Sequence, residues 1–314
     1  MTTKVINNLP DLTILDTRDE AWMAVISQNP SAHVFHHPYW MEVIQETYGY
    51  HPLIAAFVDG DGNILAGCPI MEIRNFASHP KWISLPFSDY CQILCANDSL
   101  REPLVNRINE LAIDNQIGIL EFRCDTSTLL KKSSKHVLTS TELFPDLKII
   151  EGKIKSNDSR KLRAAISRGV ETCSDTTTEF MDIYYQLHIQ TRHRLGLPVQ
   201  PKKFFNLIQQ KMLQNGLGFV TLAKVDGHYV AGSVFLSWRQ TLVYKFNATS
   251  QLGRDLYAND AIIWDAIRYG CANDYRLLDW GRTDLDDDGL RRFKNRWAST
   301  EVPLVYSNNT YSSH

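Results

Sequence analysis

The sequence predicts an α/β protein of two similar domains, each with a mixed central sheet flanked by helices. At 314 residues the chain is longer than one hydrophobic core normally supports. The patterns typical of helices and strands follow the same order in both halves, and short stretches of sequence recur at matching places in that order. We therefore expect a boundary near residue 150, with domains at residues 1–150 and 151–314.

The first half begins with a short strand at 12–15 and helices at 18–27 and 38–48. A hairpin follows, because alternating apolar residues flank Asp59-Gly60-Asp61-Gly62, whose glycines allow the positive φ of a tight turn. Apolar residues at helical spacing then indicate a helix at 99–115. Further strands are expected at 82–94, 117–123 and 136–143.

The second half repeats this order. Amphipathic helices around 180–187 and at 202–213 precede a hairpin at 219–238, and a strand at 241–248, a helix at 259–272, a strand at 276–280, a short helix at 289–297 and a strand at 302–306 follow. Val58-Asp59-Gly60 recurs as Val225-Asp226-Gly227, and Ile119-Leu120-Glu121-Phe122 matches Leu277-Leu278-Asp279-Trp280. The two matches together indicate a tandem repeat.

Composition excludes several classes of protein. Hydrophobic residues at 44% and charged residues at 22% are values of a folded globular chain. A net charge of -2 disfavours a general nucleic-acid binder, and no DNA partner is expected. The six cysteines form neither a CxxC pair nor a zinc spacing, as expected of buried thiols in a reducing compartment. Without a signal peptide or an apolar run of transmembrane length, the sequence predicts a cytoplasmic protein and leaves peripheral membrane association open.

Seven segments carry a resemblance to a known family. They are PYW (38–40), AGCPIM (66–71), SLPFSDY (84–90), SRKLRAAISRGV (159–170), NDAIIWDAI (259–267), LLDWGRTD (277–284) and DGLRRFKNRW (288–297). With the order of elements, they resemble two GNAT acetyltransferase folds in tandem, as in Fem-type (FemA/FemB/FemX) aminoacyltransferases and their FemAB-like or BioF2-like relatives. The resemblance implies acyl or aminoacyl transfer to a small-molecule or lipid-linked amine of a cell-envelope or related precursor. The implied donor is aminoacyl-tRNA or acyl-CoA, with no tightly bound cofactor.

Two features depart from that family. Only Gly196-Leu197-Pro198 joins the two helices between which some members insert a long helical hairpin. The lysine that the family places shortly after the first-domain tryptophan is absent, since Trp40 is followed by Met41, Glu42 and Val43. The resemblance associates that lysine with a nucleotide-linked muramyl substrate, so the acceptor here need not be the same.

Acyl transfer to an amine needs a base for the ammonium proton and positive charge or N–H donors for the oxyanion. Lys294 falls on the family's FK motif, and the resemblance assigns this lysine to the donor and to the negative charge of the reaction. The segment 289–300 around it holds four cations and no acid, so it either binds a phosphate-rich donor or forms an exposed basic face. Asp89, in an apolar strand, is the second catalytic candidate, as a general base; otherwise it caps a turn.

Candidate substrate-binding residues lie in three places. The segment 153–168 is basic and opens a helix with Ser159 as the expected cap; it binds a diphosphate or a tRNA backbone, unless it is an ordinary exposed helix. Asp279 and Arg282, at a strand end, either position substrate or pair with each other. The full set of candidates is Arg160, Lys161, Arg163, Tyr244, Asn259, Asp279, Arg282 and Arg292.

The sequence is compatible with three hypotheses about function. The first is a transferase that uses aminoacyl-tRNA; the second is an N-acyltransferase that uses acyl-CoA, for example on an exopolysaccharide; the third is a binding protein on the same fold. The expected loop at 251–256 matches the coenzyme A pyrophosphate motif only loosely, which argues against the second. Asp284 to Gly289 imitates a calcium loop, but Asn295 stands where that loop needs a glutamate, and capping by Asp287 or Asp288 is expected instead of a metal.

Overall fold

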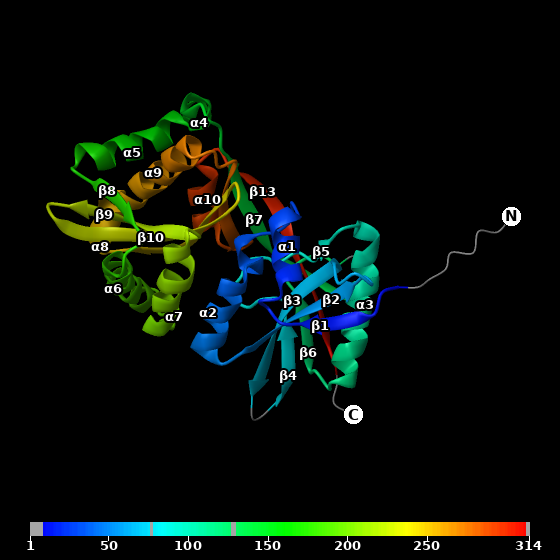
Figure 1. The fold of residues 1–314 in the computed structure, drawn as a ribbon. Coiled ribbons are helices and arrows are strands. Elements are labelled where there is room, and N and C mark those ends of the chain that lie inside the picture. The colour runs from blue at the N-terminus through cyan, green and yellow to red at the C-terminus, as the bar shows by residue number, and fades with distance from the viewer. Residues whose placement is uncertain (1–8, 76–77, 127–129, 312–314) are drawn as a thin grey trace. The chain divides into compact units, whose positions relative to one another are not determined.

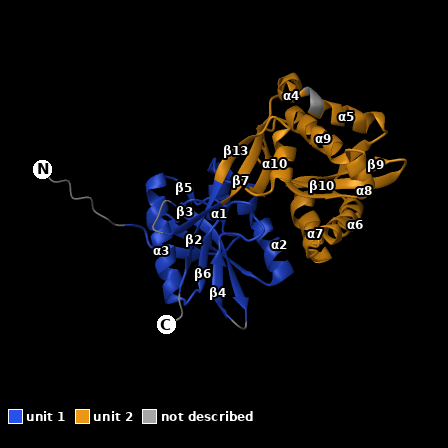
Figure 2. Ribbon diagram, turned by 180° about the vertical axis from the view of Figure 1, so that it is seen from behind, with its two compact units in different colours: residues 1–134, 304–314 blue, residues 135–303 orange. Residues whose placement is uncertain are grey.

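The computed structural model describes residues 9–75, 78–126 and 130–311, with only the backbone described at 156 and 157. The chain divides into two compact units, residues 1–134 with 304–314 and residues 135–303 (Figure 2). The divisions fall inside β7 (Lys131–Glu142) and β13 (Thr300–Thr310). The domain boundary expected near residue 150 falls in α4 (Leu147–Lys153) of unit 2 and stays a prediction.

Unit 1 is a mixed sheet with helices packed on it (Figure 1). Its strands lie in the order β1-β2-β3-β4-β6-β13, with β5 paired to β3, and among its described residues only β4 and β6 pair in parallel. Besides the C-terminal part of β13, its elements are β1 (Leu12–Leu15), α1 (Glu20–Gln28), α2 (Pro38–Tyr48), β2 (His51–Val58), β3 (Ile64–Asn75), β4 (Ser78–Ile83), β5 (Leu94–Cys95), α3 (Arg101–Asp114) and β6 (Ile119–Phe122).

The predicted hairpin between β2 and β3 is present. The Asp59 carboxylate accepts from the backbone N–H groups of Asp61 and Asn63, at 3.0 and 2.8 Å, and Gly62 has a φ of 88°. Such side-chain bonds to the backbone are the usual way in which aspartate stabilises a turn. The strand expected at 82–94 is wrong, because β4 already ends at Ile83. Leu85 and Phe87 have φ of 59° and 66°, left-handed values that a strand cannot accommodate.

Unit 2 has the same kind of architecture. Its strands lie in the order β7-β12-β11-β10-β9-β8, and within the part that the structure describes only β11 and β12 pair in parallel. Besides parts of β7 and β13, and α4, its elements are α5 (Ser156–Ser167), β8 (Glu171–Asp175), α6 (Thr178–Arg194), α7 (Lys202–Leu207), β9 (Gly218–Val225), β10 (His228–Trp238), β11 (Thr241–Thr249), α8 (Gln251–Asp255), α9 (Ala258–Ala272), β12 (Leu277–Asp284) and α10 (Asp288–Asn295).

Helices cover both faces of the sheet of unit 2, α9 on one face and α6 on the other (Figure 1). Successive side chains of a strand point to opposite faces. On β10, Ala231 and Phe235 accordingly join the core cluster that contains Ile263 of α9. A Cβ at Gly232 would lie 3.2 Å from the ring of Tyr184 in α6, so glycine there permits close helix packing. The sheet is therefore buried on both faces.

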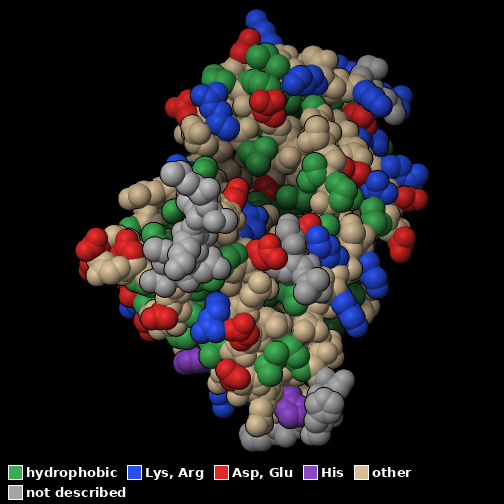
Figure 3. All heavy atoms as spheres, turned by 90° about the vertical axis from the view of Figure 1, so that its right-hand side faces the viewer, with side chains coloured by type: hydrophobic (Ala, Val, Ile, Leu, Met, Phe, Trp, Pro, Cys, Tyr) green, Lys and Arg blue, Asp and Glu red, His purple; other side chains and the backbone are tan. Residues whose placement is uncertain are grey.

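The surface gives little indication of function at this level. No helix in the described parts of the chain is both long and apolar enough to cross a bilayer. On the face shown in Figure 3, basic and acidic side chains are interspersed. Among described residues, no group of His, Cys, Asp and Glu is arranged to hold a metal ion.

Candidate active site

In unit 2, the parallel strands β11 and β12 begin as neighbours and then separate. Thr241, Leu242 and Val243 pair with Leu277, Leu278 and Asp279, and within the described residues no pair of these two strands follows. β11 nevertheless continues to Thr249 and β12 to Asp284. In unit 1 the parallel pairing of β4 with β6 runs to Ile83 and Glu121, and it stops there because β4 itself ends at Ile83. The separation expected from the sequence is thus present, and it opens the sheet where two substrates could meet.

A bulge in β12 bends the strand at this point. Its register with β7 shifts between Asp279 and Arg282, and Gly281 within the bulge has a φ of 68°. The Gly281 N–H donates to Oδ1 of Asp279 at 2.7 Å, and its carbonyl accepts from Nζ of Lys294 at 3.1 Å. Two buried side chains of opposite charge therefore hold the two peptide groups that flank the Gly281 Cα, where glycine permits the conformation.

Lys294 is buried, with 2% of the residue exposed, although its neighbours on α10 are partly or fully exposed. Besides the Gly281 carbonyl, its ammonium donates to the carbonyl of Arg282 at 3.2 Å and to Oγ1 of Thr283 at 2.7 Å. An ammonium has three N–H donors, and these three contacts can use all of them. Lys294 thus anchors α10 to the bulge and brings a positive charge to the point where the strands separate.

Tyr244 lies on β11 beside this bulge. Its ring packs edge-on against Trp280 with 5.7 Å between centroids. Burial raises the pKa of the Tyr244 hydroxyl, and its hydrogen bonds with Ser233 and Asn247 offset only part of that rise. The hydroxyl therefore stays neutral at physiological pH and keeps a proton to donate.

Asn259, at the start of α9, is tied to the far end of β11. Its amide exchanges two hydrogen bonds with the amide of Asn247, at 3.0 and 3.2 Å, and its Oδ1 accepts from Thr249 Oγ1 at 2.7 Å. This network fixes the N-terminus of α9 relative to β11. Asn259 is therefore brought to the opening of the sheet, as a residue that holds its rim.

The segment 251–256, expected as a loop, contains the helix α8, so the prediction of a loop is wrong. Ser250 caps the helix, because its Oγ accepts from the Gly253 N–H at 3.1 Å. Gly253 also packs against β10, since a Cβ there would lie 2.4 Å from the Val230 carbonyl oxygen. A serine before a helix is a signal for a cap, and the sequence prediction missed it.

The cations of α10 do not form an open basic face. Arg291 pairs with Glu301 at 2.9 Å, and Arg296 reaches a carboxylate oxygen of Asp260 at 2.9 Å. Arg292 is exposed and donates to the Asp288 carbonyl at 3.1 Å. The Asp287 carboxylate accepts from the Leu290 N–H at 2.9 Å, so the predicted cap of this helix is confirmed.

The ion pair of Asp260 with Arg296 was not predicted from the sequence. Burial raises the pKa of the Asp260 carboxyl, while Arg296 and the nearby charge of Lys161 lower it in part. Arg296 also lies 3.9 Å from a carboxylate oxygen of Asp158 on α5. The pair joins α9 to the segment after α10, and no local pattern links residues this far apart along the chain.

The basic helix α5 begins at Ser156, so Ser159 is not its cap. Ser159 lies inside the helix, where its hydroxyl donates to the Lys155 carbonyl at 3.3 Å. Lys161 is brought close to Asp260, whereas Arg160 is exposed. Arg163 borders a hollow of about 350 Å³, whose other lining residues are Glu151, Ile154, Asp158, Ser159, Leu162, Trp264 and Trp297.

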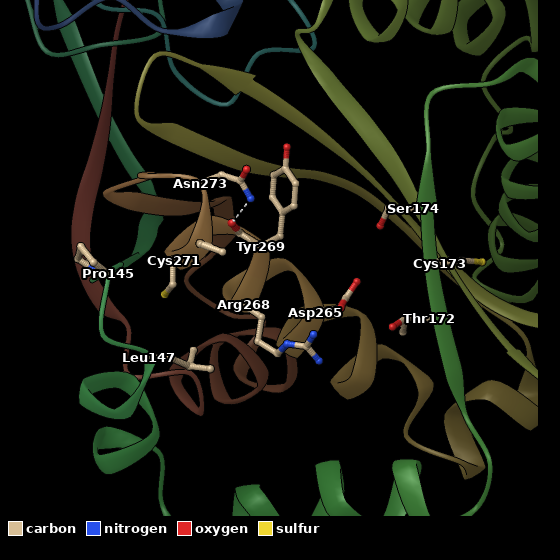
Figure 4. Close-up of a pocket in the computed structure, with 11 residues that line it drawn as sticks. Pro145, Leu147, Thr172, Cys173, Ser174, Asp265, Arg268, Tyr269, Cys271 and Asn273 are labelled. Carbon is tan, nitrogen blue, oxygen red and sulfur yellow. Dashed lines mark hydrogen bonds between the residues drawn. The ribbon is translucent and has the colours of Figure 1, made fainter.

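A larger hollow, of about 530 Å³, lies elsewhere in unit 2. Figure 4 shows it between β8, which contributes Thr172 and Ser174, and α9, which contributes Asp265 and Arg268. Burial raises the pKa of Asp265, while Arg268 and a hydrogen bond with Thr172 lower it in part. None of the residues predicted to bind substrate lines this hollow.

Asp89 lies in unit 1, in an irregular segment and not in a strand. Its backbone carbonyl accepts from the Tyr306 hydroxyl at 2.5 Å. The preceding residue is held as well, because Ser88 Oγ accepts from Trp40 Nε1 at 3.0 Å. The carboxyl-bearing residue is half-buried on a fixed segment. Asp89 and Lys294 thus belong to different units, and their joint role in catalysis stays a prediction.

Comparison with known proteins supports the fold. Residues 152–295 match the family model described as "Acetyltransferase (GNAT) domain". The structure resembles that of FemX, with a TM-score of 0.77 and 14% identity over 95% of this chain and 97% of that one. It resembles L-PGS from Bacillus licheniformis, with a TM-score of 0.61 and 14% identity over 99% and 95% of the two chains.

A tandem GNAT protein from the clavulanic acid biosynthesis pathway is also similar, with a TM-score of 0.60 and 9% identity over 97% of this chain and 100% of that one. A search of curated proteins finds no match. The prediction of tandem GNAT-like folds is confirmed by these structures, and the prediction of an acyltransferase by the family match. Residues 152–295 are therefore similar to a GNAT acetyltransferase domain, in a chain whose fold resembles that of FemX.

Proposed function

We propose that this chain transfers an aminoacyl group from aminoacyl-tRNA to an amino group of a cell-envelope or related precursor. The observation that carries the proposal is the opening between β11 and β12, bordered by the bulge that Lys294 anchors. An opened sheet can hold donor and acceptor in line for attack, which supplies much of the rate of a reaction between two molecules. Because aminoacyl-tRNA is made in the cytoplasm, the proposal implies a cytoplasmic location.

In this reaction the acceptor nitrogen attacks the ester carbonyl, a C–N bond forms, and the C–O bond to the tRNA ribose breaks. The oxyanion that develops is stabilised by positive potential in a site that excludes water. Lys294 provides that potential through the bulge, since its donors are bonded to the protein itself. The neutral hydroxyl of Tyr244 is suited to give a proton to the leaving oxygen, and Asp89 is proposed as the base.

The tRNA part of the donor would lie along α5. Arg160 and Arg163 are exposed there, and Lys161 extends the same basic segment toward Asp260. Phosphate groups are attracted to such a segment without sequence preference, and the attraction weakens with salt. Arg292 on α10, also exposed, is proposed as a further contact.

The second candidate function is N-acyl transfer from acyl-CoA, for example to an amino sugar of an exopolysaccharide. The family match to an acetyltransferase domain favours it. The N-terminus of α9, which follows β11, also has the partial positive charge that attracts a phosphate. Against it, the N–H of Gly253 in the preceding α8 is already bonded to Ser250. A role as a non-catalytic binding protein is the third candidate.

The first experiment measures the unfolding temperature of the protein with acetyl-CoA, long-chain acyl-CoA or bulk aminoacyl-tRNA, with free coenzyme A and uncharged tRNA as controls. A ligand at a hundred times its Kd adds about 2.7 kcal/mol to the free energy of unfolding. We expect aminoacyl-tRNA to raise the midpoint more than uncharged tRNA does. A rise with coenzyme A thioesters alone would replace the proposal with the second candidate.

A transfer assay then tests catalysis directly. Protein, tRNA charged with a labelled amino acid and amine-bearing envelope precursors are incubated, and label in the precursor is measured. Tyr244→Phe keeps the ring that packs on Trp280 and removes the hydroxyl, so it should lower kcat while the fold is kept. Absence of transfer to every amine tested, together with no thermal shift by any donor, would favour the binding-protein hypothesis.

A further inference from the structure

The turn after α6 holds two leucines in solvent. Leu195 and Leu197 are 52% and 44% exposed, and Gly196 lies between them with a φ of 65°. Large aliphatic side chains at a loop tip gain nothing from exposure to water, because each would be stabilised by burial. Isolated exposed leucines are common in proteins, so the surroundings of this pair must show whether it has a function.

Hydrogen bonds hold the turn in a conformation that leaves both leucines exposed. The N–H of Leu197 donates to the carbonyl of Arg192 at 3.0 Å, and Nε of Arg192 donates to the carbonyl of Pro198 at 2.9 Å. Further along, Gln200 is held by the hydroxyl of Tyr185 at 3.1 Å. The two leucines are therefore presented in a fixed conformation, and little conformational entropy is lost if a partner covers them.

The charge around the turn has a single sign over a long stretch of sequence. Between Asp182 and Asp226 the chain contains no Asp or Glu, and it contains Arg192, Arg194, Lys202, Lys203, Lys211 and Lys224. Arg194 and His193 are exposed directly beside the leucines, whereas Lys202 is paired with Asp182 at 2.7 Å. The tip thus combines exposed aliphatic groups with cations.

The helix α8 carries a similar pair of side chains. Thr191, one turn before the tip, accepts at Oγ1 from the N–H of Thr249 at 2.9 Å, which ties the end of α6 to the last residue of β11, two residues before α8 begins. α8 carries Leu252, 50% exposed, and the exposed Arg254. Its one acid, Asp255, accepts from the side chain of Gln251 at 3.0 Å. This helix therefore repeats the combination of leucine and arginine.

From this combination we propose that the α6–α7 turn docks the protein on an anionic lipid bilayer, with Leu195 and Leu197 inserted at the level of the headgroups. Aliphatic side chains enter the acyl boundary while flanking cations meet anionic headgroups, which is how peripheral proteins bind bilayers. RNA would use the cations but not the leucines. A protein partner needs an interface of about 800 Å² on each side, larger than a single turn provides. The inference does not rest on the proposed donor or acceptor.

The test is flotation of the full-length protein with vesicles of equimolar phosphatidylglycerol and phosphatidylcholine, or of phosphatidylcholine alone. We expect binding to the anionic vesicles that weakens with salt. Leu195→Ser with Leu197→Ser should reduce that binding more than about tenfold, because two inserted side chains are lost. Arg194→Gln should reduce it about fivefold, the effect of one cation near an anionic surface.

A matched control replaces two other exposed aliphatic residues, Ile113 and Leu285, by serine. They are 54% and 40% exposed, but they lie beside Asp114 and beside Asp284 and Asp286, so the double variant should float like the wild type. Unfolding temperatures of all variants should match the wild type, since no core contact is removed. Equal flotation of the Leu195/Leu197 variant and the wild type would overturn the proposal. So would tRNA binding that needs Arg194 but not the leucines, in a protein that floats with neither vesicle.

Discussion

Replacement of Lys294 by methionine tests whether this lysine holds the bulge of β12. Methionine keeps the length and apolar contacts of the side chain and removes three hydrogen bonds, at 3.1, 3.2 and 2.7 Å. Each bond of a charged donor contributes about 1.5–3 kcal/mol, and loss of the buried charge offsets part of that sum. We therefore expect Lys294→Met to lower the free energy of unfolding by about 3 kcal/mol. For a domain of this size the unfolding temperature should fall by about 6–12 °C.

The assay is thermal unfolding followed by circular dichroism, with Arg292→Met as the matched control. Arg292 lies on the same helix, but it is exposed and its Nε donates to the helix backbone at Asp288, so its loss should change the midpoint by at most about 2 °C. A lysine whose only role is to contact substrate would not stabilise the empty protein. If Lys294→Met unfolds at the wild-type temperature, the anchoring role is refuted.

Three further changes test the packing and the buried charges. In the folded protein the pKa of Asp260 lies above its ordinary value of 3.8, so the contribution of this carboxyl to stability is lost as the pH rises from 3.8 toward neutral. Over the same pH range Asp260→Asn should gain stability relative to the wild type, which urea titrations measure. Burial lowers the pKa of His36 from 6.5 to about 4, so the free energy of unfolding of the wild type should fall by about 3 kcal/mol as the pH falls from 6.5 to 4. A His36→Gln variant should lack this loss, and an equally steep fall in its stability would contradict the assignment. Gly253→Ala should destabilise the protein, because the added Cβ would lie 2.4 Å from the Val230 carbonyl oxygen. Gly152→Ala is the control and should be neutral or stabilising, because no atom lies within 4 Å of the added Cβ. Equal melting temperatures of the two variants would count against the close packing of α8.

Periodicity and turn residues were sufficient to predict most of the fold. The hairpin around Asp59 could be predicted from its turn residues, and the parallel arrangement of β11 and β12 from the order of elements that the two halves share. The prediction of a strand at 82–94 failed because residues other than glycine adopt a positive φ there. Leu85 and Phe87 end β4 by their positive φ, and nothing in an apolar stretch of sequence indicates that. Asp89 was for this reason assigned to a strand that does not exist.

The candidate site was predicted by motif, but its contacts were not. The FK motif identified Lys294, yet its partners lie on β12, and only the three-dimensional structure brings α10 against that strand. A single glycine within a strand pattern is a known indication of a bulge, so Gly281 was a signal from which the bulge in β12 could have been predicted. The pair of Asp260 and Arg296 had no such indication, because complementary charges distant in sequence are too common to match by inspection.

The return of β13 to unit 1 has a consequence for synthesis on the ribosome. Ser307 to Thr310 pair with β6 at Phe122 to Ile119, and they follow all of unit 2 in the chain. While unit 2 is being translated, β6 lacks this neighbour, and an unpaired strand edge invites association with other chains. Unit 1 can thus complete its sheet only after unit 2 has left the exit tunnel. A nascent chain stalled before residue 304 should accordingly depend on chaperones more than the released protein does.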